Sequence, residues 1–442
     1  MNPVVGVPGV DFSVEDVRGT FPGELEITPL DRPPDASIRV PGSKSVTNRA
    51  LLVAALADGP SRITNPLFSD DSYWLMDALV KLGFGLNADR EGGEARVDGR
   101  GGEIPASNVD LFVGNAGTVA RFLPPALALG PGPYTVDGVP RMRERPVSDL
   151  VEGMRQLGAA VEYAGKRERF PLKVRGGGMR GGTARVSGAR SSQFASGLLM
   201  AAPYAEAPVT LRVEGREQWP YIGITVALMR SFGVDVVESP GHFSVQPSTY
   251  KPLDYAVEPD ASAASYFMAA AAATGGRIEI PGLGSTSTQG DLRFAEVLQQ
   301  MGCKVNLAPD SIEIHGPARL RGVDVDMNAF SDTMMTLAAI APFAAGPTTI
   351  RNVAHTRLQE TDRLSAVAAE LGRLGVPTHQ TSSSIHIIPQ TPRPAVVRTY
   401  GDHRMAMAFA VTGLVEAGIS IEDPGCVTKT FPDFFGRLRE LR

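Results

Sequence analysis

The feature that most constrains the fold of this chain is a repeat of about seventy residues. A helical pattern ending in an apolar residue and a glycine, then a short alternating strand, recurs as LVKLGFGLNAD, GMRQLGAAVEYAG, ALMRSFGVDVVE, VLQQMGCKVNLA and ELGRLGVPTHQT. Glycine just past a helix end adopts the left-handed conformation without a Cβ clash. We therefore expect these helices to end at the glycine of each copy, namely Gly83, Gly158, Gly233, Gly302 and Gly375.

A second pattern alternates with the first: a small or polar residue, a helix rich in Ala, Leu and Met, a Gly/Pro turn and a β-branched strand. Its helices are apolar nearly all round and should be buried, whereas the amphipathic helices of the first pattern should coat the outside. The segment FPDFFGRLREL supplies a sixth copy of the first helix, so the chain has six units. The buried helices should be capped by the residues that open them, Ser43, Asn115, Ser191, Asp260, Ser331 and Asp402. If the units pack around pseudo-threefold axes, several helix N-termini converge and create a site for phosphate and carboxylate groups.

Bulk properties exclude several classes of protein. A chain of 442 residues exceeds what one hydrophobic core usually supports, so we expect two domains or one large repetitive assembly. A content of 43% hydrophobic and 21% charged residues is typical of a soluble globular protein. The net charge of −5 argues against nucleic acid as the main partner, and no apolar stretch is long enough to cross a bilayer. Cys303 and Cys426 lie far apart, and the six histidines are scattered. We expect no metal, no cofactor and a reducing cytosolic location, and residues 1–20 do not resemble a signal or transit peptide.

The first two buried helices open with residues suited to anions. PGSKSVTNRALL places Lys44 and Ser45 at a helix start and Arg49 one turn further, without the spacing of a nucleotide-binding P-loop. GNAGTVARFL brings Gly117 beside a helix opening and Arg121 onto its first turn. Each segment alone is often an ordinary helix entry.

Further candidates follow at the later junctions. PRMRERP contains three arginines, and because such charge runs are usually solvated, only Arg141 is a candidate. SSQF offers uncharged hydrogen-bonding groups at Ser191, Ser192 and Gln193. The remaining junctions supply possible proton carriers and cations, namely Asp332, Glu360, Asp362, Arg363, Asp402, His403, Arg404 and Lys429.

Seven segments occur in an order that resembles one family. They are PGSKSVTNRALL, GNAGTVARFL, PRMRERP, SSQFASGLLMAAP, ETDRL, DHRMAM and KTFPDFF, and they look like the landmarks of 5-enolpyruvylshikimate-3-phosphate synthases from about Val40 to the C-terminus. The resemblance implies the inside-out α/β barrel of enolpyruvyl transferases: two domains of three βαβαββ-type units each, with buried helices and outer sheets. Residues 22–41 and 258–442 would form one domain and 42–257 the other, with hinges near 41–42 and 257–258 and an N-terminal extension of residues 1–21.

The resemblance also implies a role for individual residues. The proton carriers would be Asp332 and Glu360, with Lys44 as a further catalytic residue. Phosphoenolpyruvate would be bound by Lys44, Gly117, Arg121, Arg141, Gln193, Arg363, Arg404 and Lys429. Shikimate 3-phosphate would be bound by Lys44, Ser45, Arg49, Ser191, Ser192, Gln193, Tyr221, Asp332 and Gln359. The family needs no metal or cofactor and is a target of glyphosate. With Gly117 beside the phosphate, we expect this protein to be sensitive to glyphosate, although Phe122 replaces the common Pro. We take a monomer as the default expectation.

Three residues depart from the family pattern. Gln359 stands where Lys is common, His355 where Asn is frequent, and Gln218 where Ser usually precedes Tyr221. The lost cation raises the hypothesis that Arg357 or His355 compensates for it. Two alternatives stay open: the sister UDP-N-acetylglucosamine enolpyruvyltransferase, and a paralogue that binds ligands without turnover.

Overall fold

The computed structural model describes residues 7–215 and 219–442, so Gln218 lies outside the described residues. The chain divides into two compact units. Unit 1 contains Gly42–Val257 and the described part of the segment that ends at Val17, and unit 2 contains Arg18–Pro41 and Glu258–Arg442. The chain therefore passes between the units at residues 17–18, 41–42 and 257–258. The expected extension of residues 1–21 is divided between the two units.

Within the described residues, each unit contains three sheets. In unit 1 the strand orders are β14(Asp254–Ala256)-β3(Pro60–Thr64)-β5(Glu94–Asp98)-β4(Gly85–Asp89), β6(Val109–Phe112)-β7(Tyr134–Asp137)-β9(Leu172–Val174)-β8(Val161–Tyr163) and β10(Gly182–Ser187)-β11(Val209–Glu214)-β13(His242–Val245)-β12(Val237–Ser239). In unit 2 they are β16(Lys304–Leu307)-β17(Ser311–His315)-β15(Arg277–Pro281)-β2(Asp35–Ser37), β18(Asp324–Asp326)-β19(Thr348–Arg351)-β21(Ile385–Ile387)-β20(Thr378–Gln380) and β1(Glu24–Ile27)-β23(Ile419–Glu422)-β22(Ala395–Val397).

The sheets share one pattern of pairing, which is the expected repeat. In the sheet of β6 to β9, β6 and β7 are parallel, β9 pairs antiparallel with β7, and β8 pairs antiparallel with β9. The sheets of β10 to β13 and of β18 to β21 repeat this order. Helices connect the parallel strands, as a parallel pair requires. Each of these sheets belongs to one βαβαββ unit.

Strands that are distant in the sequence complete the other sheets. β14 pairs in parallel with β3, and β2 pairs in parallel with β15. β1 adds antiparallel to β23. The segments just before the crossings at 41–42 and 257–258, and β1 after the crossing at 17–18, are therefore fixed by backbone hydrogen bonds to the unit in which they lie.

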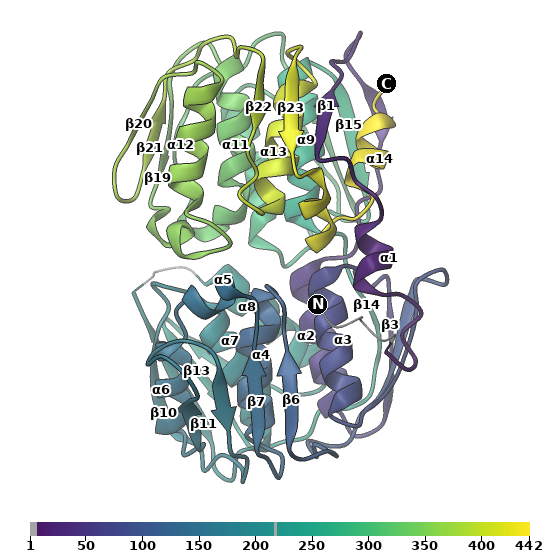
Figure 1. Cartoon of the computed structure of the whole chain (residues 1–442), viewed down its shortest axis with the longest axis vertical. Helices are drawn as coiled ribbons and strands as arrows, with labels where there is room; N and C mark the ends of the chain where they lie inside the picture. Colours follow the sequence, from purple (N-terminus) through teal and green to yellow (C-terminus); the bar gives the residue numbers. More distant parts are fainter. Residues whose placement is uncertain (1–6, 216–218) are drawn as a thin grey trace. The chain divides into compact units, whose positions relative to one another are not determined.

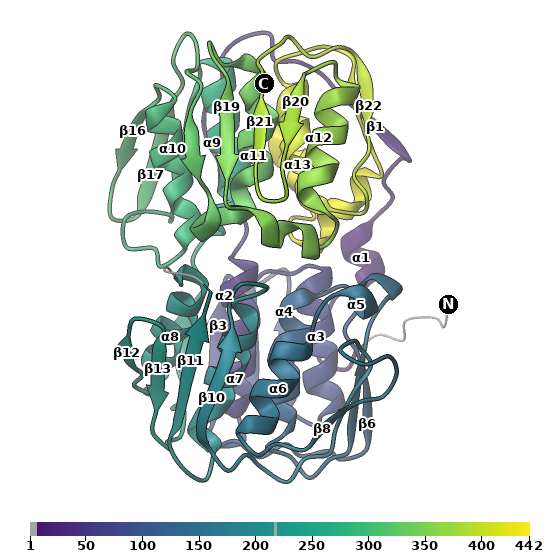
Figure 2. The same cartoon turned by 90° about the vertical axis from the view of Figure 1, so that its left-hand side faces the viewer.

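The helices of the apolar pattern form the centre of each unit. In unit 1 they are α2 (Lys44–Leu56), α4 (Gly117–Leu127) and α7 (Gln193–Ala201), and in unit 2 they are α9 (Ala261–Thr274), α11 (Met334–Ile340) and α13 (His403–Gly413). All residues of α4, α11 and α13 are buried. In unit 2, α9, α11 and α13 contact one another, and strands lie outside them (Figures 1 and 2). Helices inside and sheets outside are thus confirmed.

The amphipathic helices alternate with these, as expected. They are α3 (Asp70–Lys81), α6 (Ser148–Gln156), α8 (Pro220–Ser231), α10 (Phe294–Gln300), α12 (Arg363–Arg373) and α14 (Phe434–Arg439). The predicted glycine ends are confirmed, because all five glycines of this pattern have positive φ, between +78° and +105°. Backbone geometry therefore requires glycine at these positions.

The predicted caps are only partly correct. The side chains of Asp260 and Asp402 accept hydrogen bonds from Ala263 and Arg404 backbone N–H groups, as N-caps do. Ser43 occupies the N-cap position of α2 without such a bond. Asn115, Ser191 and Ser331 are not the N-caps: α4 and α7 begin one residue later than expected, after Ala116 and Ser192. Ser331 lies within the 3-10 turn η3 (Asn328–Thr333), so that the α-helix begins only after Thr333.

The segment before the first strand covers α3. Phe12 is 3% exposed, and its ring contacts Phe68 and Tyr73 edge-on, at centroid distances of 5.3 and 5.7 Å. α3 also contacts α2, α4, β4 and β6, and it is buried over most of its length, including Asp70 and Asp71. The expectation that it coats the outside is therefore wrong, because other elements cover most of the helix.

Candidate active site

Arg363 is the centre of a buried charge network in unit 2. It is the first residue of α12, and its side chain is 2% exposed. Nε donates to Asp402 Oδ2 over 2.8 Å, Nη2 lies 2.9 Å from Glu360 Oε2, and Nη1 donates to Asp332 Oδ1 over 3.2 Å and to Gln359 Oε1. Burial lowers the pKa of Arg363, but the charges of Asp402, Glu360 and Asp332 outweigh it and raise the pKa above its ordinary value. Arg363 is a permanent cation that orients three carboxylates.

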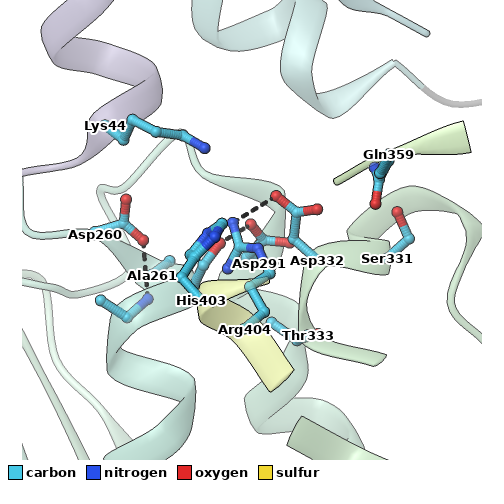
Figure 3. Close-up of polar contacts among 12 residues, drawn as sticks. Lys44, Asp260, Ala261, Asp291, Ser331, Asp332, Thr333, Gln359, His403 and Arg404 are labelled. Atoms are coloured by element: carbon cyan, nitrogen blue, oxygen red, sulfur yellow. Dashed lines mark hydrogen bonds and ion pairs between the residues drawn. The ribbon is translucent and has the colours of Figure 1, made fainter. Parts of the chain in front are cut away.

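Arg404 holds the other side of Asp332. Nη2 donates to Asp332 Oδ2 over 2.7 Å (Figure 3). Nη1 donates to the Tyr266 hydroxyl over 3.4 Å. Burial lowers the pKa of Arg404, yet the Asp332 carboxylate raises it to a net value well above the ordinary one. The Asp332 side chain is 21% exposed, so its carboxylate is fixed by two arginines and still reaches solvent. A group placed in this way can exchange protons with a bound ligand.

Glu360 lies between two cations. Its side chain is 7% exposed, with Oε2 next to Arg363 and Oε1 4.0 Å from Lys429 Nζ. Lys429 ends the 3-10 turn η6 (Pro424–Lys429), which contacts α13. The N-terminal ends of α12 and α13 and the turn that precedes α11 thus converge on one cluster of charges. α11 and α13 are buried helices, whose starts were expected to converge, whereas α12 belongs to the amphipathic pattern, for which no convergence was predicted.

Gln359 and His355, which depart from the family pattern, each have a defined hydrogen-bond partner. Gln359 accepts a hydrogen bond from Arg363, so a neutral amide lies beside the cluster. His355 Nε2 lies 2.7 Å from the Ser331 hydroxyl. Arg357 is directed to other groups: its guanidinium donates to Asp362 over 2.8 and 3.0 Å, and further bonds go to Ser365, Gln380, Thr381 and Ser382. The Arg357 side chain therefore links the turn before α12 to the β20–β21 hairpin.

In unit 1, two cations near the start of α2 lie in different environments: Lys44 is the first residue of the helix, and Arg49 follows one turn later. Lys44 Nζ lies 3.6 Å from Asp71 Oδ2, and its side chain is 11% exposed. Arg49 is 1% exposed, and its guanidinium donates hydrogen bonds to groups on several helices. The acceptors are the Thr225 and Ser196 hydroxyls, at 2.7 and 3.2 Å, and the backbone carbonyls of Ser45 and Tyr221, at 2.8 and 3.1 Å. Burial lowers the pKa of Arg49 to about 9, so it is a cation at neutral pH.

The start of α4 brings two buried arginines together. Arg121 donates to the carbonyl of Gly117 over 3.2 Å and to that of Pro146 over 3.3 Å. Arg145, which the sequence left unselected, is 6% exposed and lies against Gly117. Arg141, the arginine selected from PRMRERP, is 34% exposed and pairs with Glu144 over 2.8 Å.

The uncharged candidates cluster near the starts of α7 and α8. The Ser191 hydroxyl accepts from the backbone N–H of Gln193, the first residue of α7, over 3.2 Å. Ser192 is the 8% exposed N-cap of that helix. Tyr221 is the second residue of α8, and its carbonyl is bonded to Arg49.

Among residues 7–215 and 219–442, no three His, Cys, Asp or Glu side chains are grouped as ligands of a metal ion would be. No helix among them combines the length and apolar character that a membrane span requires.

A sequence model described as "EPSP synthase (3-phosphoshikimate 1-carboxyvinyltransferase)" matches residues 32–438. The chain belongs to the EPSP synthase family. A family member from Nostoc punctiforme, a 3-phosphoshikimate 1-carboxyvinyltransferase, is 49% identical over 420 residues, which cover 94% of this chain and 99% of the relative. Another, from Serratia proteamaculans, is 45% identical over 413 residues, which cover 92% of this chain and 96% of the relative.

Solved structures confirm the fold class. The EPSP synthase of Acinetobacter baumannii superposes with a TM-score of 0.80 at 25% identity, covering 95% of this chain and 98% of that one. The enolpyruvyl transferase NikO from Streptomyces tendae superposes with a TM-score of 0.77 at 20% identity, over 95% and 98% of the two chains. The two-unit, helix-inside architecture is therefore that of the EPSP synthase family.

Sequence reasoning missed several residues of these clusters. Asp402 was expected as a cap and as a possible charged group of the last junction, but its pairing with Arg363 through both oxygens, at 2.8 and 3.3 Å, was not. Tyr266 lies within a uniformly apolar helix, where nothing in the local pattern distinguishes it from a core residue. Arg145 had a usable signal in the proline that follows it, because a residue before proline favours extended backbone.

Proposed function

We propose that this enzyme transfers the enolpyruvyl group of phosphoenolpyruvate to the 5-hydroxyl of shikimate 3-phosphate, in the shikimate pathway of aromatic amino-acid biosynthesis. The hydroxyl oxygen bonds to C2 of phosphoenolpyruvate while C3 gains a proton, which gives a tetrahedral ketal phosphate. Loss of phosphate from C2 and of a proton from C3 then restores the double bond in the product. Family membership supports this reaction.

The single observation that supports the chemistry best is the pair of carboxylates arranged around Arg363. Asp332 and Glu360 are both bound to its guanidinium, at 3.2 and 2.9 Å. We assign Glu360 to protonate C3 and later to remove that proton. Asp332 or Glu360 assists loss of the hydroxyl proton, and the partial exposure of Asp332 fits a group that meets a bound alcohol.

The cations are proposed to bind and activate phosphoenolpyruvate. In unit 2 these are Arg363, Arg404 and Lys429, and in unit 1 Lys44, Arg121 and Arg141. Gly117 contributes the backbone of the α4 N-terminus, whose N–H groups and dipole favour a phosphate. Fixed positive charge of this kind stabilises the negative charge that develops in both steps.

Shikimate 3-phosphate is proposed to contact groups of mixed polarity. Unit 1 contributes Lys44, Ser45, Ser191, Ser192, Gln193 and Tyr221, and unit 2 contributes Asp332 and Gln359. For Arg49, the contacts favour a more specific role. Because its guanidinium binds the carbonyls of Ser45 and Tyr221, it fixes the backbone of two proposed ligand residues and adds positive charge behind them.

Release of inorganic phosphate tests the reaction. The purified protein is incubated with phosphoenolpyruvate and shikimate 3-phosphate in the presence of a chelator, with UDP-N-acetylglucosamine as the alternative acceptor. Release that requires shikimate 3-phosphate is the expected result. Release only with the sugar nucleotide would favour the sister enzyme, and binding of shikimate 3-phosphate without release would indicate a non-catalytic paralogue.

A further inference from the structure

Glu370 is a second buried carboxylate of α12, and it lies outside the charge cluster around Arg363. The residue is 0% exposed. Its Oε1 accepts a hydrogen bond from the Tyr400 hydroxyl over 2.7 Å. Its Oε2 accepts one from the backbone N–H of Arg398 and one from Arg373 Nε, each over 3.0 Å. Because a buried carboxylate is stable only when it is paired and hydrogen-bonded, these contacts hold residues 398–400 against α12.

Tyr400 lies in a tight turn that leads into α13. The backbone N–H of Asp402 donates to the carbonyl of Thr399 over 2.9 Å, which closes the turn. Both central residues, Tyr400 and Gly401, have positive φ, +56° and +66°, as the central residues of a type I′ turn do. A bulky aromatic residue rarely adopts this conformation, so the rest of the structure must stabilise it. The hydrogen bond from the Tyr400 hydroxyl to Glu370 does so.

The turn ends at a residue of the charge cluster, Asp402. The carboxylate of Asp402 accepts from Arg363 Nε over 2.8 Å and from the backbone N–H of Arg404 over 3.0 Å. The Arg404 side chain in turn donates to Asp332 over 2.7 Å (Figure 3). The position of the turn therefore determines how the start of α13 meets the candidate active site.

α12 binds the segment of residues 398–402 at two points. Arg363 and Glu370 are seven residues apart, about two helical turns, and so lie on the same face of α12. Arg363 binds Asp402 at one end of the segment, and Glu370 binds Tyr400 near its middle. Burial, and then the hydrogen bond to Glu370 and its charge, raise the pKa of Tyr400 above the ordinary value, so its hydroxyl remains a donor at neutral pH.

We propose that Glu370 and Tyr400 are positioning residues for the enzyme: their hydrogen bond holds the turn before α13 and thereby sets the position of Arg404. Neither residue is assigned a contact with a substrate. The inference rests on the proposed function of Arg404, which is to bind phosphoenolpyruvate. Loss of the hydrogen bond should therefore weaken the use of phosphoenolpyruvate more than the binding of shikimate 3-phosphate, most of whose proposed ligands lie in unit 1.

The variant Tyr400→Phe tests the positioning role, because it removes the hydroxyl and keeps the ring. We expect kcat/KM for phosphoenolpyruvate to fall about fivefold and the Kd for shikimate 3-phosphate to change less than about twofold. Tyr134→Phe is the matched control, since it removes a hydroxyl that donates over 2.8 Å to the carbonyl of Ala106 in unit 1. It should lower the urea midpoint about as much as Tyr400→Phe does, and leave kcat/KM unchanged. An unaltered kcat/KM in Tyr400→Phe, an equal loss in Tyr134→Phe, or equal weakening toward both substrates would overturn the proposal.

A double-mutant cycle with Glu370→Gln tests the contact itself. In the Glu370→Gln background, Tyr400→Phe should lower kcat/KM for phosphoenolpyruvate less than about twofold, because the charged acceptor of the hydroxyl is gone. An undiminished fivefold effect in that background would contradict the contact.

Failure of the proposed function would be distinguishable from failure of this inference. A parent that releases phosphate together with an unimpaired Tyr400→Phe overturns only the positioning role. If the parent releases no phosphate, the proposed function fails, and calorimetric binding of phosphoenolpyruvate in the presence of shikimate 3-phosphate then decides the inference. Weaker binding by Tyr400→Phe than by the parent would support it, and equal binding, or none by either protein, would overturn it.

Discussion

Arg404 Nη2 donates to Asp332 Oδ2 over 2.7 Å, which fixes a partly exposed carboxylate at the start of the fifth buried helix. If Asp332 takes part in proton transfer, Asp332→Asn should lower kcat at least about 100-fold while shikimate 3-phosphate still binds. Steady-state phosphate release and calorimetry measure the two quantities. Asp324→Asn, which removes an exposed carboxylate paired with Arg351, is the control and should keep full activity. A kcat for Asp332→Asn within about threefold of the parent would exclude the assigned role.

Arg363 is expected to be structural as well as functional. Arg363→Met removes the shared cation from Asp332, Glu360 and Asp402, so that buried carboxylates lose compensation, and the free energy of unfolding of unit 2 should fall by about 3–5 kcal/mol. Urea unfolding followed by circular dichroism measures it.

The exposed pair of Arg351 with Asp324 offers the comparison, because its 2.6 Å contact is solvated. Arg351→Met should change stability by at most about 1 kcal/mol. Equal losses of unfolding free energy in Arg363→Met and Arg351→Met would show that the buried network stabilises the protein no more than an exposed ion pair does.

Arg357 should not compensate for the missing cation at Gln359. Its guanidinium is bonded to Asp362 and to the β20–β21 hairpin, so Arg357→Ala should change the Kd for shikimate 3-phosphate less than about twofold. Isothermal titration calorimetry measures this. Tenfold weaker binding would restore the hypothesis of compensation, and His355→Ala, which removes the partner of Ser331, then becomes the informative comparison.

Glu313 should contribute stability that is lost in acid. Hydrogen bonds from His315 and Asn306, and the Arg277 guanidinium, lower its pKa from 4.5 to about 2 despite opposing desolvation. Because the folded pKa lies below the unfolded one, the stabilisation is present above pH 4.5 and disappears as the pH falls toward 2. Glu313→Gln should therefore lower the free energy of unfolding by about 1 kcal/mol at pH 7, and the difference should shrink at about pH 3. A constant difference in urea midpoint across this range would contradict the assignment.

Local sequence patterns were sufficient to predict the repeated units, but not the pairing of strands that are distant in the sequence. The glycines that end the amphipathic helices follow from a steric rule, and each has the expected positive φ. Pairing of β14 with β3, of β2 with β15 and of β1 with β23 joins segments far apart in the chain. Their short strands carry no register signal. The family resemblance implied crossings near 41–42 and 257–258, but neither it nor the local patterns indicated the crossing at 17–18.

The sequence predicted candidate site residues at helix starts, but it did not predict which side chains are buried. Asp260 and Asp402 follow the rule for N-caps, but Ser331 does not, because a 3-10 turn intervenes before α11. Among the arginines of PRMRERP, composition could not reveal that Arg145 is buried and Arg141 partly exposed. That distinction depends on where a five-residue helix ends.

The Glu360 carboxylate is proposed to carry the proton to and from C3 of phosphoenolpyruvate. Exchange of the methylene hydrogens of phosphoenolpyruvate in D2O, with shikimate 3-phosphate present and followed by NMR, tests this assignment. The parent should exchange them by forming and reversing the tetrahedral intermediate. Glu360→Gln, which keeps the side-chain shape, should bind both substrates and lose exchange and phosphate release together, by at least about 100-fold. Exchange at the parental rate in Glu360→Gln would contradict the account.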